Sequence, residues 1–188
     1  MSGGRRAVFL DRDGVLVATE VHGGKPIAAL TLADFAILPE APAAVAALKS
    51  AGFVTVVVTN QPEMARGNVD SATMDAMHAR LSQAMPIDAV YVCPHDSGDG
   101  CGCRKPAPGM LLRAADELGL DLASSYMVGD RWRDVGAGRA AGCTTVLIEC
   151  GYDEPERLEP DLTVGDVAEA AARILDRDAA ARASGERA

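Results

Sequence analysis

A short apolar run that ends abruptly in two carboxylates is the feature that most constrains the fold of this chain. Residues 7–10 read Ala-Val-Phe-Leu, and Asp11, Arg12, Asp13 and Gly14 follow directly. Such a run is typical of a strand buried in a parallel sheet, and ligands of these sheets bind at the carboxyl ends of the strands. Two acids at that place need a positive group between them, which Mg²⁺ with oxygen ligands would supply. The alternative is an ordinary polar exit from a strand, where acids and glycine are common.

Short apolar runs and helical patterns alternate along the rest of the chain. Further strands are predicted at residues 54–58, 89–92, 126–128 and 144–148, and helices at 42–51, 71–85, 109–118, 133–141 and 167–176. This alternation predicts βαβ units, and therefore a Rossmann-like three-layer α/β sandwich with a mostly parallel central sheet. We expect a single domain over residues 1–177 and a flexible tail over 178–188.

Charge and hydropathy exclude several classes of protein. The net charge of −9 argues against a nucleic-acid binder, which needs a basic face. The sequence has no apolar run of 18 residues and no signal peptide, so we expect a cytoplasmic protein without a membrane partner. In that compartment the five cysteines are expected to be reduced or metal-bound. We expect the protein to be a monomer that acts on a small molecule.

Polar residues follow three of the predicted strands directly. Asp11, Thr59 and Asp130 each come after a separate strand or its closing glycine. In a parallel sheet these exits share one edge, so the three side chains are expected to converge on one site.

Four segments, taken in order, resemble the four motifs of the haloacid dehalogenase superfamily. They are Asp11-Arg12-Asp13-Gly14, Thr59-Asn60, Lys105-Pro106 and Gly129-Asp130 through Asp134. The match spans roughly residues 7–150. It implies the fold of that superfamily and a phosphatase activity.

The residue types of these motifs suit phosphoryl transfer. A carboxylate such as Asp11 can attack phosphorus and hold the phosphoryl group covalently. Asp13, two residues on, can protonate the leaving oxygen and then activate water. The resemblance implies these same roles, with Mg²⁺ held by Asp11, the Asp13 backbone carbonyl and Asp130. It also implies that Thr59 and Lys105 contact the phosphoryl oxygens.

The role of Asp134 stays open between an outer-shell metal contact and an acid that supports a helix.

The second acid, Asp13, argues against haloalkanoate dehalogenation, which needs neither this acid nor Mg²⁺. The segments from Asp13 to Thr59 and from Thr59 to Lys105 are too short for a large cap domain. An uncapped site is open to water, which favours hydrolysis over a phosphomutase reaction.

Three thiols and an imidazole lie close together before Lys105. Cys93, His95, Cys101 and Cys103 match a closed tetrahedral Cys₃His zinc site, which would be structural because no ligand position stays open. Disulfide pairing is the alternative, but it is disfavoured in the cytosol. The loop between these ligands has few apolar side chains, so zinc binding would order it and fix where Arg104 and Lys105 point.

The zinc loop narrows the resemblance to one branch of the superfamily, which contains D-glycero-D-manno-heptose 1,7-bisphosphate 7-phosphatases and histidinol-phosphate phosphatases. The likeness implies a set of substrate-binding residues: Thr59, Asn60, Gln61, Arg104, Lys105 and Arg131. Arg131 stands where the heptose enzymes usually have Lys. Pro62-Glu63 and the loop 19–26 also depart from their pattern, and these departures bear on the identity of the sugar.

The cations near the motifs favour a substrate with two phosphates. They are Arg12, Arg66, Arg104, Lys105, Arg131 and Arg133, in a chain that is acidic overall. Together with this second phosphate, the resemblance implies a heptose 1,7-bisphosphate as the substrate. Histidinol phosphate is the alternative, because Glu20 and Glu63 could bind its cationic groups. A non-catalytic, zinc-stabilised binding protein is the alternative from another class, although Asp11 and Asp13 are both present.

Overall fold

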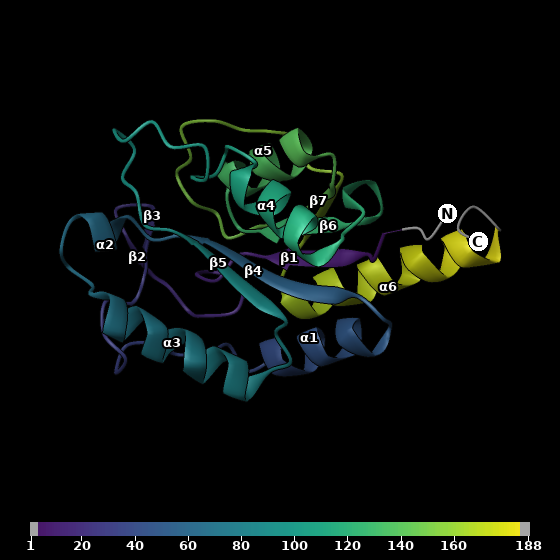
Figure 1. Ribbon diagram of the computed structural model, residues 1–188, viewed down its shortest axis with the longest axis horizontal. Helices are drawn as coiled ribbons and strands as arrows, with labels where there is room; N and C mark the ends of the chain where they lie inside the picture. Colours follow the sequence, from purple (N-terminus) through teal and green to yellow (C-terminus); the bar gives the residue numbers. More distant parts are fainter. Residues whose placement is uncertain (1–3, 185–188) are drawn as a thin grey trace.

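A six-stranded parallel sheet forms the centre of this computed structural model, which describes residues 4–184 (Figure 1). The strand order is β5-β4-β1-β6-β7-β8, and every neighbouring pair runs parallel. The strands are β1 (Ala7–Leu10), β4 (Val54–Asn60), β5 (Ala89–Cys93), β6 (Tyr126–Gly129), β7 (Thr144–Ile148) and β8 (Leu162–Val164). The strand order reverses direction at β1, so β1 lies at the switch point where such sheets bind ligands.

Helices cover both faces of the sheet. One face carries α1 (Ala41–Ser50), α3 (Ser71–Ala84) and α6 (Val167–Ala183), and the other carries α4 (Gly109–Leu118) and α5 (Trp132–Ala141) (Figure 1). Successive strand residues point to opposite faces. Val8 and Leu10 accordingly pack into the first layer, and Ala7 and Phe9 into the second. The predicted three-layer α/β sandwich is confirmed.

Local sequence signals set the helix ends. The Asp70 carboxylate accepts the Thr73 backbone N–H at 2.7 Å and caps α3, as its place in the sequence suggests. Helix α4 ends at Gly119, which adopts the left-handed conformation that glycine tolerates best.

The structure also contains elements that the apolar pattern does not predict. Strands β2 (Glu20–His22) and β3 (Lys25–Ile27) form a hairpin, Pro62–Ala65 forms the short helix α2, Leu122–Ser124 forms a 3₁₀ turn, and β8 extends the sheet. The hairpin and its loops fill the segment between β1 and α1, so this segment holds no large cap domain.

The boundary of the predicted tail is wrong. Helix α6 continues to Ala183 instead of ending at 176, so residues 178–183 are helical, and Asp178 is buried. The rest of the predicted tail beyond residue 184 lies outside the described residues.

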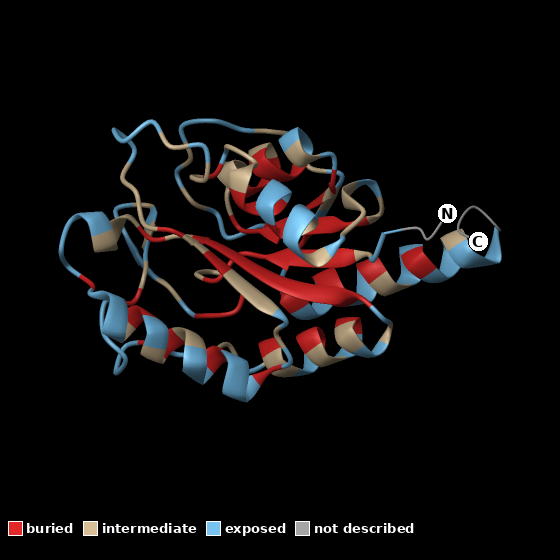
Figure 2. Cartoon of the chain, viewed as in Figure 1, coloured by how far each residue is buried: buried red, intermediate tan, exposed pale blue. Residues whose placement is uncertain are grey.

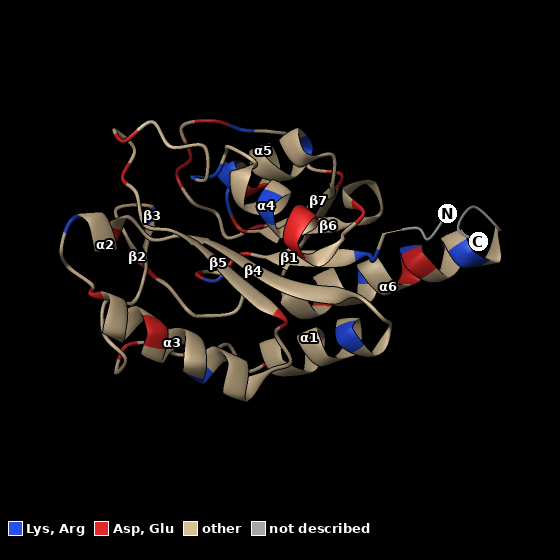
Figure 3. Ribbon diagram, viewed as in Figure 1, with Lys and Arg blue, Asp and Glu red and all other residues tan. Residues whose placement is uncertain are grey.

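The central strands are buried, while the outer faces of the helices are exposed (Figure 2). The six strands carry no Lys, Arg, Asp or Glu, so the charged residues lie on helices, the hairpin and loops (Figure 3). No helix within residues 4–184 has the length and apolar character needed to cross a membrane.

Candidate active site

A cavity of about 940 Å³ opens beyond the carboxyl ends of the strands. Its walls come from the residues after β1, β4, β6 and β7, from the hairpin and from the segment before α4. Most of the sequence-predicted site residues line it: Asp11, Asp13, Asn60, Gln61, Arg104, Lys105, Asp130 and Arg131. Of the three strand exits expected to converge, Asp11 and Asp130 therefore meet at the cavity, whereas Thr59 does not line it.

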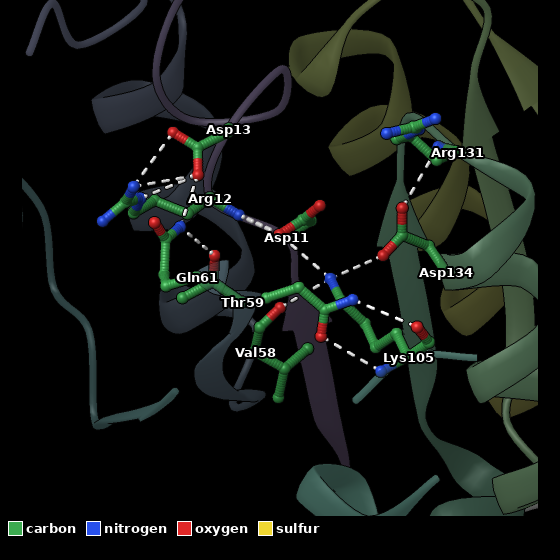
Figure 4. A network of polar contacts seen from close by, with 10 residues as sticks. Asp11, Arg12, Asp13, Val58, Thr59, Gln61, Lys105, Arg131 and Asp134 are labelled. Atoms are coloured by element: carbon green, nitrogen blue, oxygen red, sulfur yellow. Dashed lines mark hydrogen bonds and ion pairs between the residues drawn. The ribbon is translucent and has the colours of Figure 1, made fainter. Parts of the chain in front are cut away.

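Asp11 is held by one of its two carboxylate oxygens. Its Oδ1 accepts the Arg12 backbone N–H at 2.7 Å and lies 2.9 Å from the Lys105 ammonium (Figure 4). Neither contact uses Oδ2, and Asp11 is nine-tenths buried at the wall of the cavity. The side chain is thus fixed in orientation while one oxygen stays available to a ligand.

Lys105 is a buried cation that joins two acids. Its ammonium lies 2.9 Å from Asp11 Oδ1 and 2.6 Å from Asp134 Oδ1, and it donates to the Val58 carbonyl at 2.8 Å (Figure 4). Burial alone would lower the pKa of Lys105, but the charges of Asp11 and Asp134 outweigh it and raise this pKa. The ammonium therefore stays charged at the floor of the site.

Asp134 supports a helix as well as Lys105. Its Oδ2 accepts the Arg131 backbone N–H at 3.1 Å, at the start of α5. Burial raises the pKa of Asp134 to about 6, against the charge of Lys105. The helix-supporting alternative for Asp134 is therefore realised, while its carboxylate also lies close to those of Asp11 and Asp130.

Asp13 is turned toward Arg12 and Gln61 rather than toward Asp11 (Figure 4). Arg12 Nε donates to Asp13 Oδ2 at 3.0 Å, and Gln61 Nε2 donates to the same oxygen at 2.7 Å. Burial raises the pKa of Asp13 above its ordinary value, although the Arg12 charge opposes this. A raised pKa suits a carboxyl group that has to deliver a proton.

Arg12 itself is completely buried and does not line the cavity. Its inclusion among the cations expected to bind a second phosphate is therefore wrong. Its guanidinium packs over the Phe35 ring and lies near Met74 and His78. The sequence position could not show this, because adjacent residues of an extended segment point in opposite directions.

Asp130 has the environment expected of a metal ligand. Both of its carboxylate oxygens are buried without a normal hydrogen bond from the described residues. Ligand oxygens of Asp11, Asp130 and Asp134 lie within 4.8 Å of one another. Burial and the charges of Asp11 and Asp134 raise the pKa of Asp130 well above its ordinary value. A hard divalent cation would compensate this clustered negative charge, so the residues present fit Mg²⁺.

Gly14 allows the first motif to approach Asp130. Its φ is +82°, a conformation that other residues avoid. A Cβ atom at this position would also lie 1.9 Å from Asp130 Oδ2. Only glycine fits, and the turn after Asp13 therefore lies directly against the fourth motif.

Thr59 and Asn60 are engaged by neighbouring residues. The Thr59 hydroxyl accepts from Gln61 Nε2 at 2.8 Å, and Thr59 is not among the residues that line the cavity. The Asn60 amide pairs with the Lys105 backbone in both directions, at 3.0 and 3.1 Å. Asn60 therefore orients the segment that carries Lys105.

The predicted zinc ligands converge. The Sγ atoms of Cys93, Cys101 and Cys103 lie 3.2 to 3.7 Å from one another, and His95 Nδ1 lies 3.3 Å from Cys103 Sγ. Ligands of tetrahedral zinc, with Zn–S bonds of about 2.3 Å, lie roughly 3.7 Å apart. The four residues thus form a compact set that could hold zinc.

The zinc loop is joined to the cavity through Arg104. Arg104 Nη1 donates to the His95 carbonyl at 3.0 Å, so the position of this guanidinium depends on a residue of the Cys₃His cluster.

We expect Cys101→Ser to lower the zinc content and to raise KM for the substrate, while the packed sheet stays folded. Metal analysis, thermal unfolding and steady-state kinetics measure these effects. Cys150→Ser, at an exposed cysteine outside the cluster, is the matched control. Zinc-free native protein, or unchanged kinetics in Cys101→Ser, would argue against a structural zinc.

Several residues of the cavity carry no motif and were missed from the sequence. They include Tyr152, Glu154 and Arg157, from the segment between β7 and β8. No spacing rule links this segment to the four motifs. The acids that follow β7, such as Asp153 and Glu154, could have indicated from the sequence that this segment lies near the site. Lys25 of the hairpin also lines the cavity, and it belongs to the loop 19–26 that was expected to bear on the identity of the sugar.

Comparison with known proteins gives a consistent family. Residues 102–170 match the family model described as HAD-hydrolase-like. The chain is 40% identical over 152 residues to the D-glycero-beta-D-manno-heptose-1,7-bisphosphate 7-phosphatase of Pseudomonas aeruginosa, covering 78% of this chain and 83% of the relative. It is 37% identical to the enzyme of the same name from Bordetella bronchiseptica, with 78% and 82% covered.

A solved structure agrees with these relatives. The D,D-heptose 1,7-bisphosphate phosphatase from B. bronchiseptica, complexed with magnesium and phosphate, superposes with a TM-score of 0.77 at 34% identity. The superposition covers 92% of this chain and 99% of that one.

Proposed function

This chain belongs to the haloacid dehalogenase superfamily of phosphatases, and on that premise we propose that it hydrolyses D-glycero-D-manno-heptose 1,7-bisphosphate at its 7-phosphate. The reaction is Mg²⁺-dependent and passes through an aspartyl-phosphate at Asp11. The observation that carries the proposal is the environment of the two carboxylate oxygens of Asp11. One oxygen is fixed by Lys105 and a backbone N–H, and the other is left at the wall of a cavity large enough for a sugar phosphate.

Asp11 Oδ2 attacks phosphorus, and the bond from phosphorus to the sugar oxygen breaks. Asp13 gives its proton to the departing oxygen, and its raised pKa supports that role. In the second half of the reaction Asp13 takes a proton from water, which attacks phosphorus and frees Asp11. Gln61 and Arg12 hold the Asp13 carboxylate in place for both transfers.

Mg²⁺ would be held by Asp11, Asp130 and the backbone carbonyl of Asp13. When bound it supplies positive charge for the phosphoryl oxygens and offsets the repulsion among the buried acids. Lys105, which is buried and in contact with Asp11, adds a second, fixed positive charge. Thr59 remains proposed as a hydroxyl donor to the phosphoryl group.

The arginines around the cavity divide into those that form ion pairs with acids and those that do not. The second group could bind a second phosphate of the substrate. Arg66 pairs with Glu63 and Asp96, and Arg131 pairs with Glu154. Arg104 donates to the His95 carbonyl and Arg133 packs over the Trp132 ring. Neither forms an ion pair with an acid of residues 4–184, although the charges of Glu154 and Asp134 act on Arg133. Burial and the charges of Arg131 and Arg104 lower the pKa of Arg133, so these guanidiniums repel one another. A second phosphate between them would relieve that repulsion.

Histidinol phosphate is the second candidate, but the acids that could receive its cationic groups are engaged. Glu63 contacts Arg66 and Asn68. Glu20 does not line the cavity, and it contacts His22, which does. The names of the relatives point the same way, since both curated relatives act on the heptose bisphosphate.

Arg104→Ala tests whether the enzyme uses a second phosphate. We expect it to lower kcat/KM for the heptose bisphosphate by about tenfold or more and to leave a small aryl phosphate within about twofold, because remote binding energy serves only a substrate with the remote group. Phosphate release in the presence of Mg²⁺ measures both. Arg113→Ala, at an exposed arginine paired with Glu117, is the matched control. Equal losses on both substrates, together with a better rate on histidinol phosphate, would favour the second candidate.

A further inference from the structure

Three consecutive residues between β7 and β8 bind three different elements around the cavity. We call Tyr152, Asp153 and Glu154 the strap. The Tyr152 hydroxyl lies 3.2 Å from the Thr19 hydroxyl, before β2. The Asp153 backbone N–H donates to the Gly24 carbonyl at 2.9 Å, at the turn of the β2–β3 hairpin. Glu154 pairs with Arg131, where β6 passes into α5. The strap thus joins the loop after β1, the hairpin and the fourth motif.

The contact between the strap and the hairpin depends on a glycine. Gly24 has a φ of +75°, and a Cβ atom there would lie 2.2 Å from Asp153 Oδ2. A side chain at this position would be strained by the positive φ and would force the Asp153 carboxylate to turn aside. The strap therefore lies close to the hairpin turn, and the hydrogen bond from the Asp153 backbone N–H holds the backbone next to Glu154.

Glu154 holds Arg131 through one edge of its guanidinium. Arg131 Nε donates to Oε1, and Nη2 donates to Oε2 at 2.9 Å, so both carboxylate oxygens are used. The Glu154 side chain is only 12% exposed and that of Arg131 is 24% exposed. The pairing leaves Nη1 free of Glu154, so Arg131 can donate to a ligand without giving up its acid.

Arg131 needs such a support because it stands next to two other acids. It follows Asp130 directly, and its backbone N–H binds Asp134. An unsupported guanidinium would be drawn toward these carboxylates and away from the substrate. Glu154, from the strap, binds this guanidinium instead.

We propose that Glu154 is a positioning residue, which fixes Arg131 for contact with the substrate, and that the strap is its scaffold. This inference rests on the proposed function, in which Arg131 contacts a sugar bisphosphate. Glu154 itself takes part in no bond-making step. Its removal is expected to affect binding of the substrate more than the chemical step.

A double-mutant cycle between Glu154 and Arg131 tests the proposal. Glu154→Ala should raise KM for the heptose bisphosphate about tenfold and change kcat by no more than about twofold. In the Arg131→Ala background the same substitution should add little, because its effect acts through Arg131. Glu154→Asp, which keeps the charge, should give a KM between those of wild type and Glu154→Ala. Glu156→Ala, at an exposed neighbour that does not line the cavity, is the matched control.

Two different failures are distinguishable. If the wild type itself does not prefer the bisphosphate to a simple monophosphate, the proposed function fails, and the role of Glu154 fails with it. If the wild type shows that preference but the effects of Glu154→Ala and Arg131→Ala add independently, only the positioning role is wrong. A general loosening of the strap would give that additive result, with a similar fall in kcat on a small aryl phosphate.

Discussion

Asp11→Asn is expected to abolish turnover while the protein stays folded. The substitution is nearly isosteric but removes the nucleophile, so no covalent phosphoryl intermediate can form. The fold should tolerate it, because Lys105 keeps its pairing with Asp134 and the Val58 carbonyl. Removing one of three clustered acids also relieves repulsion on Asp130, whose pKa the Asp11 charge helps to raise. Phosphate release in the presence of Mg²⁺ measures the first effect, and thermal unfolding in Mg²⁺-free buffer measures the second.

Asp116→Asn is the matched control for this experiment. Asp116 is exposed on α4 and lies outside the cavity, so the same change of charge there should leave the rate unaltered. Turnover by Asp11→Asn within tenfold of wild type would contradict the covalent mechanism, because a positioned nucleophile contributes far more than this.

Removal of Mg²⁺ is expected to bring activity to background, and its return should restore the rate. Without the ion, Asp11, Asp130 and Asp134 repel one another, and the raised pKa of Asp130 indicates that it holds a proton more readily than an ordinary aspartate. Because Mg²⁺ binds the carboxylate, it must displace this proton, so its apparent affinity should weaken as the pH falls toward that raised pKa.

Ca²⁺ should inhibit, because it is larger and tolerates looser coordination than the site requires. Metal analysis of the same samples should show zinc retained while Mg²⁺ is exchanged, which separates the two metal sites. Full activity after exhaustive chelation, with no Mg²⁺ returned, would contradict this account.

The main sheet was predictable because its strands are buried on both faces. The runs that became β1, β4, β6 and β7 carry no charged residue and are rich in β-branched and apolar side chains, and each pattern indicates a strand within a residue or two of its final bounds. The hairpin and β8 were missed for the opposite reason. Each of these strands has three residues, and β2 and β3 are mostly exposed, so neither length nor periodicity distinguishes them from loops.

The convergence of the site followed from topology alone, since strand exits of a parallel sheet share an edge. The hydrogen-bond and ion-pair partners of each charged residue could not be predicted from this topology. Arg12 and Arg104 both lie next to motif acids or cations in sequence, yet Arg12 is buried behind Asp13 and Arg104 faces the cavity. The pairing of Arg131 with Glu154 joins residues far apart in the chain. Such contacts depend on the path of loops, which local pattern does not determine.

The most direct measurement of the central claim is a ³¹P NMR time course of the wild-type protein with D-glycero-D-manno-heptose 1,7-bisphosphate and Mg²⁺. The account predicts that the resonance of the primary 7-phosphate disappears, that orthophosphate rises in equal amount, and that the resonance of the 1-phosphate persists. No orthophosphate, or loss of the 1-phosphate with the 7-phosphate retained, would contradict it.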